Sequence, residues 1–342
     1  MFKLEKSRIN ELFAAIAADA VLYLPVDVEN GGARYEQWHD GAVLSKAMNT
    51  RRSAKDFFFP QTEDLVAFKV EGQSIQVIDT RKPSDDFVIF GVRACDAASF
   101  SILDRVFLSD PVDTYYAERR KHGVIMTMAC TAPEESCFCT AFGIDATAPG
   151  GDVSCWMDDS SLYLEPITEK GRALVERLSG MLAECDSSAV AAQAAATRAI
   201  MEQLPLHDLK PDDFTQKQLE VFKSDKWAEL SQSCLGCGSC TFVCPTCQCY
   251  DIKDFDTGHG IQRMRTWDSC MYSEFTKMAA GNPRLTQLER FRQRFMHKLV
   301  YFPMNNDGVY GCVGCGRCLR KCPISMNIVK VMKALGGEYN DK

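Results

Sequence analysis

Two cysteine runs in the last third of the chain have the spacing of iron–sulfur ligands. Each run follows the pattern C-x2-C-x2-C-x3-C-P, whose thiolates hold [4Fe–4S] cubanes in ferredoxins. Small glycines between the cysteines allow the backbone to approach the inorganic sulfide closely. The first run contains Cys234, Cys237, Cys240 and Cys244, and the second contains Cys312, Cys315, Cys318 and Cys322.

The fourth cysteine of each run ligates, in two-cluster ferredoxins, the cluster of the other run. We therefore predict one [4Fe–4S] cluster on Cys234, Cys237, Cys240 and Cys322. We predict a second [4Fe–4S] cluster on Cys312, Cys315, Cys318 and Cys244. Structural zinc held by C-x2-C pairs is the alternative, but each run offers a third cysteine at the same step and a fourth beyond it. The two runs together indicate an electron-transfer module.

A second group of cysteines follows two predicted apolar strands, residues 86–92 and 123–128. This group consists of Cys95, Cys130, Cys137 and Cys139. Because ligands bind at the carboxyl ends of strands in a parallel sheet, these thiols are expected to converge on one metal centre. The pattern favours a third [4Fe–4S] cluster. The alternatives are cysteines packed as small buried side chains and a four-thiolate zinc site.

The segment between the two runs carries three more cysteines and many basic residues. We interpret Cys247, Cys249 and Cys270 as packing beside the first cluster, in preference to a further site that lacks an obvious fourth ligand. The basic residues indicate either a solvated helix face or charges that offset the clusters or dock a partner. They are Arg263, Arg265, Arg284, Arg290, Arg292, Arg294, His297 and Lys298. Cys155 and Cys185 are expected to be uninvolved.

Composition narrows the class of protein. The chain has 342 residues, 46% of them hydrophobic and 25% charged, which is typical of a globular protein with two or three domains. The net charge of −7 without a long basic run argues against a nucleic-acid partner. No apolar stretch reaches transmembrane length, and residues 1–20 predict an amphipathic helix in preference to a signal peptide. Seventeen cysteines in such a chain indicate a reducing cytoplasm.

The order of predicted elements indicates an α+β multidomain fold. Strand, helix and strand at residues 86–92, 97–106 and 123–128 predict a parallel sheet in an N-terminal α/β domain. Residues 66–70 and 74–78 predict a hairpin. The predicted divisions are an α/β domain at 1–165 with the extra iron–sulfur site, a helical linker at 166–228, and a helical dicluster ferredoxin-like domain at 229–342 with a helical insertion at 250–305.

Catalytic motifs are absent from the sequence. It contains no dinucleotide fingerprint, P-loop, zinc-protease motif or serine nucleophile elbow. The five histidines are scattered. We therefore expect the chain to transfer electrons while another subunit performs the two-electron chemistry, and we assign no catalytic residue.

The combination of motifs resembles a known family, the iron–sulfur electron-transfer subunits of anaerobic flavin-linked oxidoreductases. Members include the iron–sulfur subunit of anaerobic sulfite reductase and the sulfhydrogenase β subunit. The resemblance covers about residues 50–145 and 230–330. It rests on the second cysteine run and on Arg93-Ala-Cys-Asp96, Leu103-Asp104, Cys137-Phe-Cys139, Cys244-Pro-Thr-Cys247-Gln-Cys249-Tyr250, Trp267-Asp-Ser-Cys270 and His297-Lys298.

This resemblance implies a relay of single electrons between two partner subunits. One would be a flavin subunit with FAD and a [2Fe–2S] centre that exchanges with NAD(P)H. The other would be a terminal sulfite reductase, hydrogenase or heterodisulfide-reductase-like subunit. Two other hypotheses remain open: a catalytic reductase that uses an open N-terminal iron–sulfur centre, and a zinc-binding interaction protein.

Overall fold

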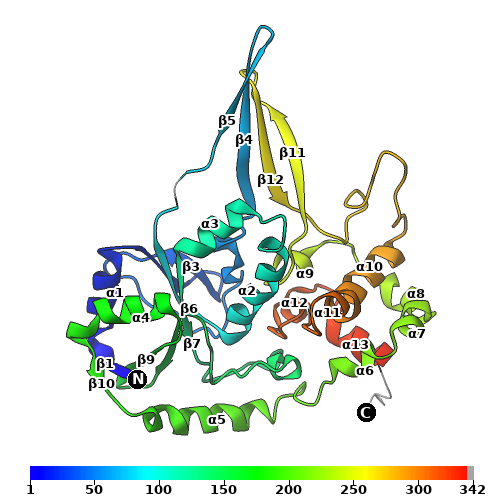
Figure 1. Cartoon of the computed structure of the whole chain (residues 1–342). Helices are drawn as coiled ribbons and strands as arrows, with labels where there is room; N and C mark the ends of the chain where they lie inside the picture. Colours follow the sequence, from blue (N-terminus) through cyan, green and yellow to red (C-terminus); the bar gives the residue numbers. More distant parts are fainter. Residues whose placement is uncertain (83, 337–342) are drawn as a thin grey trace. The chain divides into compact units, whose positions relative to one another are not determined.

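A computed structural model describes residues 1–82 and 84–336 of the chain (Figure 1). The chain divides into two compact units. The first consists of Met1–Phe58, Asp85–Lys210 and Cys312–Gly316, and the second of Phe59–Ser84, Pro211–Gly311 and the chain from Arg317 onward. No helix within the described residues is both long and apolar enough to cross a membrane.

The first unit is built on an eight-stranded sheet with the order β10-β1-β9-β8-β7-β6-β2-β3. The central strands β2, β6, β7 and β8 run parallel, as the strand–helix–strand pattern predicts, and both outer parts of the sheet are antiparallel. The strands are β1 Phe2–Glu5, β2 Val21–Asp27, β3 Ala33–Gln37, β6 Phe87–Val92, β7 Gly123–Met128, β8 Val153–Met157, β9 Ser161–Pro166 and β10 Ala183–Glu184.

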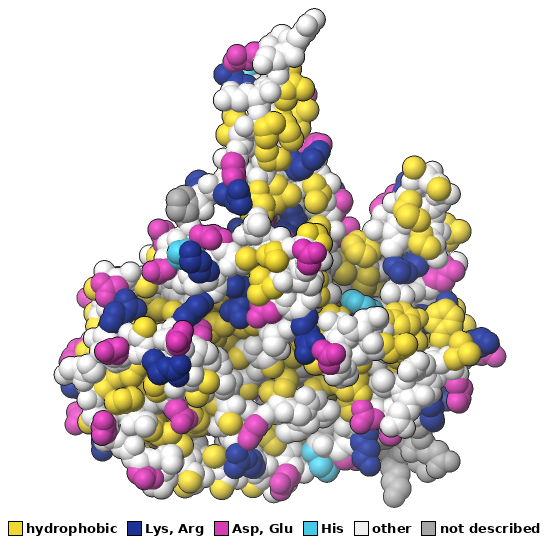
Figure 2. All heavy atoms as spheres, in the orientation of Figure 1, with side chains coloured by type: hydrophobic (Ala, Val, Ile, Leu, Met, Phe, Trp, Pro, Cys, Tyr) yellow, Lys and Arg dark blue, Asp and Glu magenta, His cyan; other side chains and the backbone are white. Residues whose placement is uncertain are grey.

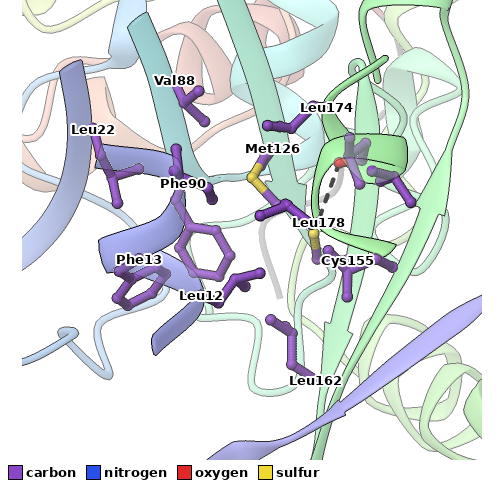
Figure 3. Close-up of a cluster of buried hydrophobic side chains, with 14 of the residues drawn as sticks. Leu12, Phe13, Leu22, Val88, Phe90, Met126, Cys155, Leu162, Leu174 and Leu178 are labelled. Atoms are coloured by element: carbon purple, nitrogen blue, oxygen red, sulfur yellow. Dashed lines mark hydrogen bonds between the residues drawn. The ribbon is translucent and has the colours of Figure 1, made fainter. Parts of the chain in front are cut away.

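One face of this sheet is covered by α1 (Ile9–Ala17) and α4 (Glu169–Arg177). Their apolar side chains meet those of the strands in one core (Figure 3). Cys155 is fully buried in this core, where its thiol donates to Val153 O at 3.9 Å. Burial raises the pKa of Cys155, so it behaves as a packed apolar side chain.

The opposite face is covered by α2 (Ala94–Phe107), which follows β6. Phe100 of α2 packs edge-on against Phe58, whose ring also contacts Phe87 of β6. Because β6 is buried along its whole length, its continuous apolar run matches the expectation for a parallel central strand. The other helices of this unit are α3 Thr114–His122, α5 Ala191–Met201 and short 3-10 turns at Lys6–Arg8, Ala54–Phe57, Cys139–Phe142, Ser179–Met181 and Ser187–Val190.

The second unit contains a four-stranded antiparallel sheet with the order β11-β12-β4-β5. The predicted hairpin is present as β4 (Thr62–Glu71) and β5 (Ser74–Asp79). The start of the insertion, predicted to be helical, is instead the hairpin of β11 (Tyr250–Asp256) and β12 (Ile261–Trp267). Tyr250 and Ile252 alternate with polar residues at the period of a strand. This alternation was overlooked because the arginine-rich sequence further along favoured a helix.

Residues 59–84 therefore lie with the C-terminal part of the chain, because β4 pairs with β12. Residues 166–210 belong to the first unit. The units thus differ from the predicted division at 165 and 228, because strand pairing joins segments that are far apart in sequence.

Helices make up the rest of the second unit. α10 begins with a capping box between Thr286 and Glu289, and a π-helical turn follows it directly. The helices are α6 Pro211–Thr215, α7 Gln218–Lys223, α8 Lys226–Gln232, α9 Ser239–Phe242, α10 Gln287–Met296, the π-helix His297–Tyr301, α11 Phe302–Asn305, α12 Arg317–Lys321 and α13 Ile328–Gly336.

The four-stranded sheet is buried only at its base. Apolar side chains are exposed along it (Figure 2). The exposed apolar residues of these strands include Ile75, Val77 and Phe255. At the base, Arg265 of β12 donates to Glu63 of β4 at 2.7 Å, and the two side chains are only 5% and 4% exposed. A buried ion pair of this kind couples the two hairpins strongly, because removing one partner leaves an uncompensated charge.

Replacing Glu63 by Gln should open this sheet. We expect the free energy of opening to fall by about 3–5 kcal/mol, because the guanidinium of Arg265 loses its buried carboxylate. Hydrogen exchange of the β4 and β12 amides measures this opening. The control is Asp254→Asn, which breaks the exposed pair with Arg263 and should leave the opening of the sheet nearly unchanged, because solvent screens that pair. Equal effects of the two substitutions would contradict the stabilising role that we assign to the buried Glu63–Arg265 pair.

Candidate iron–sulfur sites

The first three cysteines of the first run lie together with the last cysteine of the second run. Cys234 and Cys237 are in the loop before α9, and Cys240 is inside α9. Burial raises the pKa of Cys234, and the neighbouring sulfurs of Cys240, Cys237 and Cys322 raise it further. The second unit therefore brings together the four residues that we assign to one cluster. Their ligation of a cluster stays a prediction.

The loop of the first run needs its glycines. Gly238 has a φ of 71° and precedes α9, and a Cβ at this position would lie 2.7 Å from Tyr272 Oη. The Gly236 amide donates to Cys234 Sγ at 3.5 Å. Cys237 is exposed, and its hydrogen bonds with the side chain and then the backbone of Ser239 lower its pKa. These hydrogen bonds of Cys234 and Cys237 thus come from residues two positions along the chain.

Cys244, the last cysteine of the first run, lies in a different environment. Its sulfur is hydrogen-bonded by Cys247, contacts Thr246 Oγ1 at 3.2 Å and accepts from Lys298 Nζ at 3.4 Å. The hydrogen bond from Cys247, the charge of Lys298 and the contact with Thr246 hold the pKa of Cys244 well below its ordinary value despite burial. These contacts therefore favour the thiolate form of Cys244.

The three additional cysteines of the insertion gather beside Cys244. Cys247 hydrogen-bonds to Cys244, and Cys249 hydrogen-bonds to Cys270. The β11–β12 hairpin brings the second pair together, because Cys249 precedes β11, Cys270 follows β12, and the Asp268 amide donates to Cys249 O at 3.0 Å. The structure therefore places these cysteines in one packed group.

Two buried basic residues face the cysteines of the second unit. Arg294 on α10 is 3% exposed and Lys298 on the π-helix is 5% exposed. Arg294 Nε has no hydrogen-bond partner among the described residues. Burial alone would lower the pKa of Arg294, but the negative charge of nearby thiolates raises it. These thiolates are, in order of effect, Cys240, Cys318, Cys247 and Cys244.

This arrangement fits an anionic cofactor with thiolate ligands. An unpaired guanidinium is costly inside a protein, and a [4Fe–4S] centre with four cysteines carries net negative charge. The orphaned Nε of Arg294 and the surrounding sulfurs are therefore compatible with bound clusters. In the sequence, Arg294 and Lys298 are two of the eight basic residues noted between the two cysteine runs, and they were not distinguished from the other six. Their spacing of four places both on one helix face, but Arg290 and Arg294 have the same spacing, so this signal alone does not identify them.

The second run begins in the first unit. There, the Phe138 amide donates to Gly314 O at 3.0 Å, and Asn49 Nδ2 donates to Cys315 O at 3.4 Å. A Cβ at Gly314, whose φ is 60°, would lie 2.3 Å from Phe138 O. The loop that carries Cys312 and Cys315 thus packs directly on the backbone between Cys137 and Cys139.

Three of the four N-terminal cysteines converge. Burial raises the pKa of Cys139 to about 12, and the neighbouring Cys130 and Cys137 contribute to the shift. Burial likewise raises the pKa of Cys130. The charge of Arg93 partly offsets this rise, and the neighbouring Cys137 adds to it. Cys95 is buried in the first turn of α2, after the strand next to β7. Cys95 and Cys130 follow the carboxyl ends of the neighbouring parallel strands β6 and β7, and Cys137 and Cys139 lie further along the loop after β7. Their sharing of one metal centre stays a prediction.

Arg93 connects the two strand ends. Its guanidinium, in a side chain buried to 9% exposure, donates to Ala129 O at 2.8 Å and to Met128 O at 3.3 Å. Just before it, Gly91 has a φ of 80° and marks an irregularity in the β6–β7 register. A bulge at this point re-aims the end of the strand. From the sequence, Arg93 was identified only as part of a motif, and its position beside the thiols was missed.

No three His, Cys, Asp or Glu side chains among residues 1–82 and 84–336 lie close enough to hold a single metal ion. A cubane places each thiolate on a different iron atom, so its ligands need not converge on one point.

His297 provides a pH test of the α10 region. Burial, followed by the charges of Lys298 and Arg284, lowers its pKa from 6.5 to about 4. The folded protein therefore binds this proton less readily than the unfolded chain, and stability is lost as the pH falls from 6.5 towards 4. We expect the free energy of opening around Trp227, which stacks on Phe295, to be about 2 kcal/mol lower at pH 5 than at pH 7. Hydrogen exchange at the two pH values measures this.

The control for this prediction is His297→Phe, which keeps an aromatic ring beside Phe302 without a titrating group. In this variant the loss of stability between pH 7 and pH 5 should be smaller by the same amount. An unchanged pH dependence would contradict the role of His297.

Comparisons with known proteins agree with this chemistry. A family model described as a 4Fe-4S dicluster domain matches residues 233–326. The chain is 31% identical, over 96% of its own length and 96% of the relative's, to sulfhydrogenase 2 subunit beta of Pyrococcus furiosus. No solved structure matches the chain. With identity over nearly the whole chain and a matching cluster domain, the protein belongs to the sulfhydrogenase β-like family of iron–sulfur electron-transfer subunits.

Proposed function

We propose that this chain relays single electrons through three [4Fe–4S] clusters between a flavin subunit and a terminal subunit of an oxidoreductase complex. The observation that carries the proposal is the grouping of cysteines beside buried, positively charged side chains in the second unit. When bound, each cluster accepts and donates one electron. The chain's own residues position the thiolates, exclude water and supply positive charge.

Ligation of two clusters follows the crossing pattern of the two runs. Cys234, Cys237 and Cys240 with Cys322 would hold one, and the spacing assigns Cys312, Cys315 and Cys318 with Cys244 to the other. Glycines in both loops allow neighbouring groups to pack closely on the backbone, since a Cβ at Gly238 would meet Tyr272 and a Cβ at Gly314 would meet Phe138 O. Backbone amides of such loops tune a cluster through hydrogen bonds to sulfur.

The third cluster would be held by Cys95, Cys130, Cys137 and Cys139. Its support is the convergence of three of these thiols beside Arg93, which is the side chain that lowers the pKa of Cys130. The backbone contact between Phe138 and Gly314 also makes the third site a neighbour of the second run's loop within the first unit. Such contact suits electron transfer between adjacent centres.

The name of the relative describes a subunit of sulfhydrogenase 2, which supports partner subunits for this chain as well. We propose a flavin subunit with FAD and a [2Fe–2S] centre on the NAD(P)H side. On the other side we propose a hydrogenase, sulfite reductase or heterodisulfide-reductase-like subunit. The reducing cytoplasm, which keeps thiols available as ligands, is the proposed compartment.

Metal and sulfide analysis of anaerobically purified protein tests the proposal. We expect about twelve iron atoms per chain for three clusters, against about eight for the dicluster domain alone. Zinc should be absent, and dithionite reduction should give EPR signals of reduced cubanes. A colourless protein that contains zinc instead of iron and sulfide would refute the relay.

Cys137→Ser tests the third cluster separately. We expect iron to fall by about four atoms per chain, with one EPR signal lost and the dicluster signals kept. The matched control is Cys185→Ser in the same unit, which should leave iron content unchanged. If Cys137→Ser also leaves it unchanged, the N-terminal cysteines hold no cluster.

A further inference from the structure

The two halves of the dicluster site receive very different electrostatic support. Cys237, which we assign to the first cluster, is exposed, and its hydrogen bonds come from Ser239, two residues along the chain. Cys244, which we assign to the second cluster, is contacted by a lysine from another helix, a threonine and a second cysteine. Positive charge and hydrogen bonds to sulfur favour the reduced, more negative state of a cluster.

Lys298 is held in direct contact with Cys244. Its Nζ donates to Thr246 Oγ1 and to Gly311 O, both at 2.8 Å, and to Cys244 Sγ at 3.4 Å. Thr246 in turn donates to Gly311 O at 2.7 Å. These bonds fix the ammonium group beside one sulfur of the two runs. Its burial means that solvent and salt screen the charge weakly.

Arg294 acts on cysteines of both runs. Among the thiolates that raise the pKa of Arg294, Cys240 of the first run has the largest effect and Cys318 of the second run the next. Its guanidinium lies over the ring of Phe295 at 4.6 Å, which holds it on the buried side of α10. A charge in this position stabilises extra negative charge on both clusters.

We propose that Lys298 sets the reduction potential of the cluster that Cys244 ligates above that of its neighbour, while Arg294 raises both. The inference rests on the proposed ligation and adds an order to the relay. At equilibrium a single electron in the pair resides mainly on the cluster that Cys244 ligates. The fold thereby makes the two clusters of the pair unequal in potential.

EPR-monitored redox titration of the whole protein tests this order. In Lys298→Met we expect the reduction equilibrium of one cluster to fall at least tenfold, which is about 59 mV for one electron. The other cluster should stay unchanged. In Arg294→Met both should fall. Cys244→Ser and Cys322→Ser, each of which alters one predicted ligand set, assign the two signals.

Two matched variants separate charge from packing. Arg292→Met removes a charge from the same helix, where Arg292 stacks on Phe222 instead of facing cysteines, and should move neither potential. Lys298→Arg keeps the charge and should keep most of the potential difference. If Lys298→Met fails to fold, Cys247→Ala removes one hydrogen bond from Cys244 and should lower the same cluster alone, with iron content unchanged.

The failures are distinguishable. Wild-type protein without cubane signals would refute the proposed function itself. Two clusters of equal potential, a Lys298→Met variant that leaves both potentials unchanged, or one that lowers both equally, would overturn the inference and leave the relay intact.

Discussion

Repulsion between closely packed thiolates is the constraint on which this molecule depends. Sulfur atoms gathered from distant parts of the chain oppose one another's ionisation, and burial makes the opposition stronger. Each cysteine group is met by a cation from a different element: Arg93 beside Cys130, Lys298 beside Cys244, and Arg294 beside Cys240 and Cys318. The fold places these three positive charges beside the sulfur atoms.

The positions of Lys298 and Arg294 depend on how α10 and the π-helical turn after it are held in place. α10 starts at a capping box, and its aromatic side chains Phe291 and Phe295 pack on Trp227. At His297 the helix widens into a π-helical turn, a distortion that occurs frequently at functional sites. The packing of the aromatic rings anchors α10 while the basic side chains stay among the sulfurs.

Local patterns predicted much of this structure, and tertiary contacts decided the rest. The cysteine runs and the strands β6 and β7 were predictable, because spacing and continuous apolar sequence are local properties. The hairpin β11–β12 was missed, because Ile252 and Ile261 are interspersed with charges that also suit a helix. Arg263 and Arg294 are the same residue type in one basic segment, yet one pairs with exposed Asp254 and the other faces cysteines. Only the folded chain distinguishes them.

The pairing of β4 with β12 affects how the chain folds as it is synthesised. Glu63 and its partner Arg265 are 202 residues apart, so the ribosome releases the β4–β5 hairpin long before its partner strand exists. A two-stranded hairpin alone is marginally stable in water. During that interval its apolar side chains and an open strand edge stay available to other chains. During synthesis, the β4–β5 hairpin therefore stays unpaired until the β11–β12 hairpin has been made. Pairing of β4 with β12 then completes the four-stranded sheet.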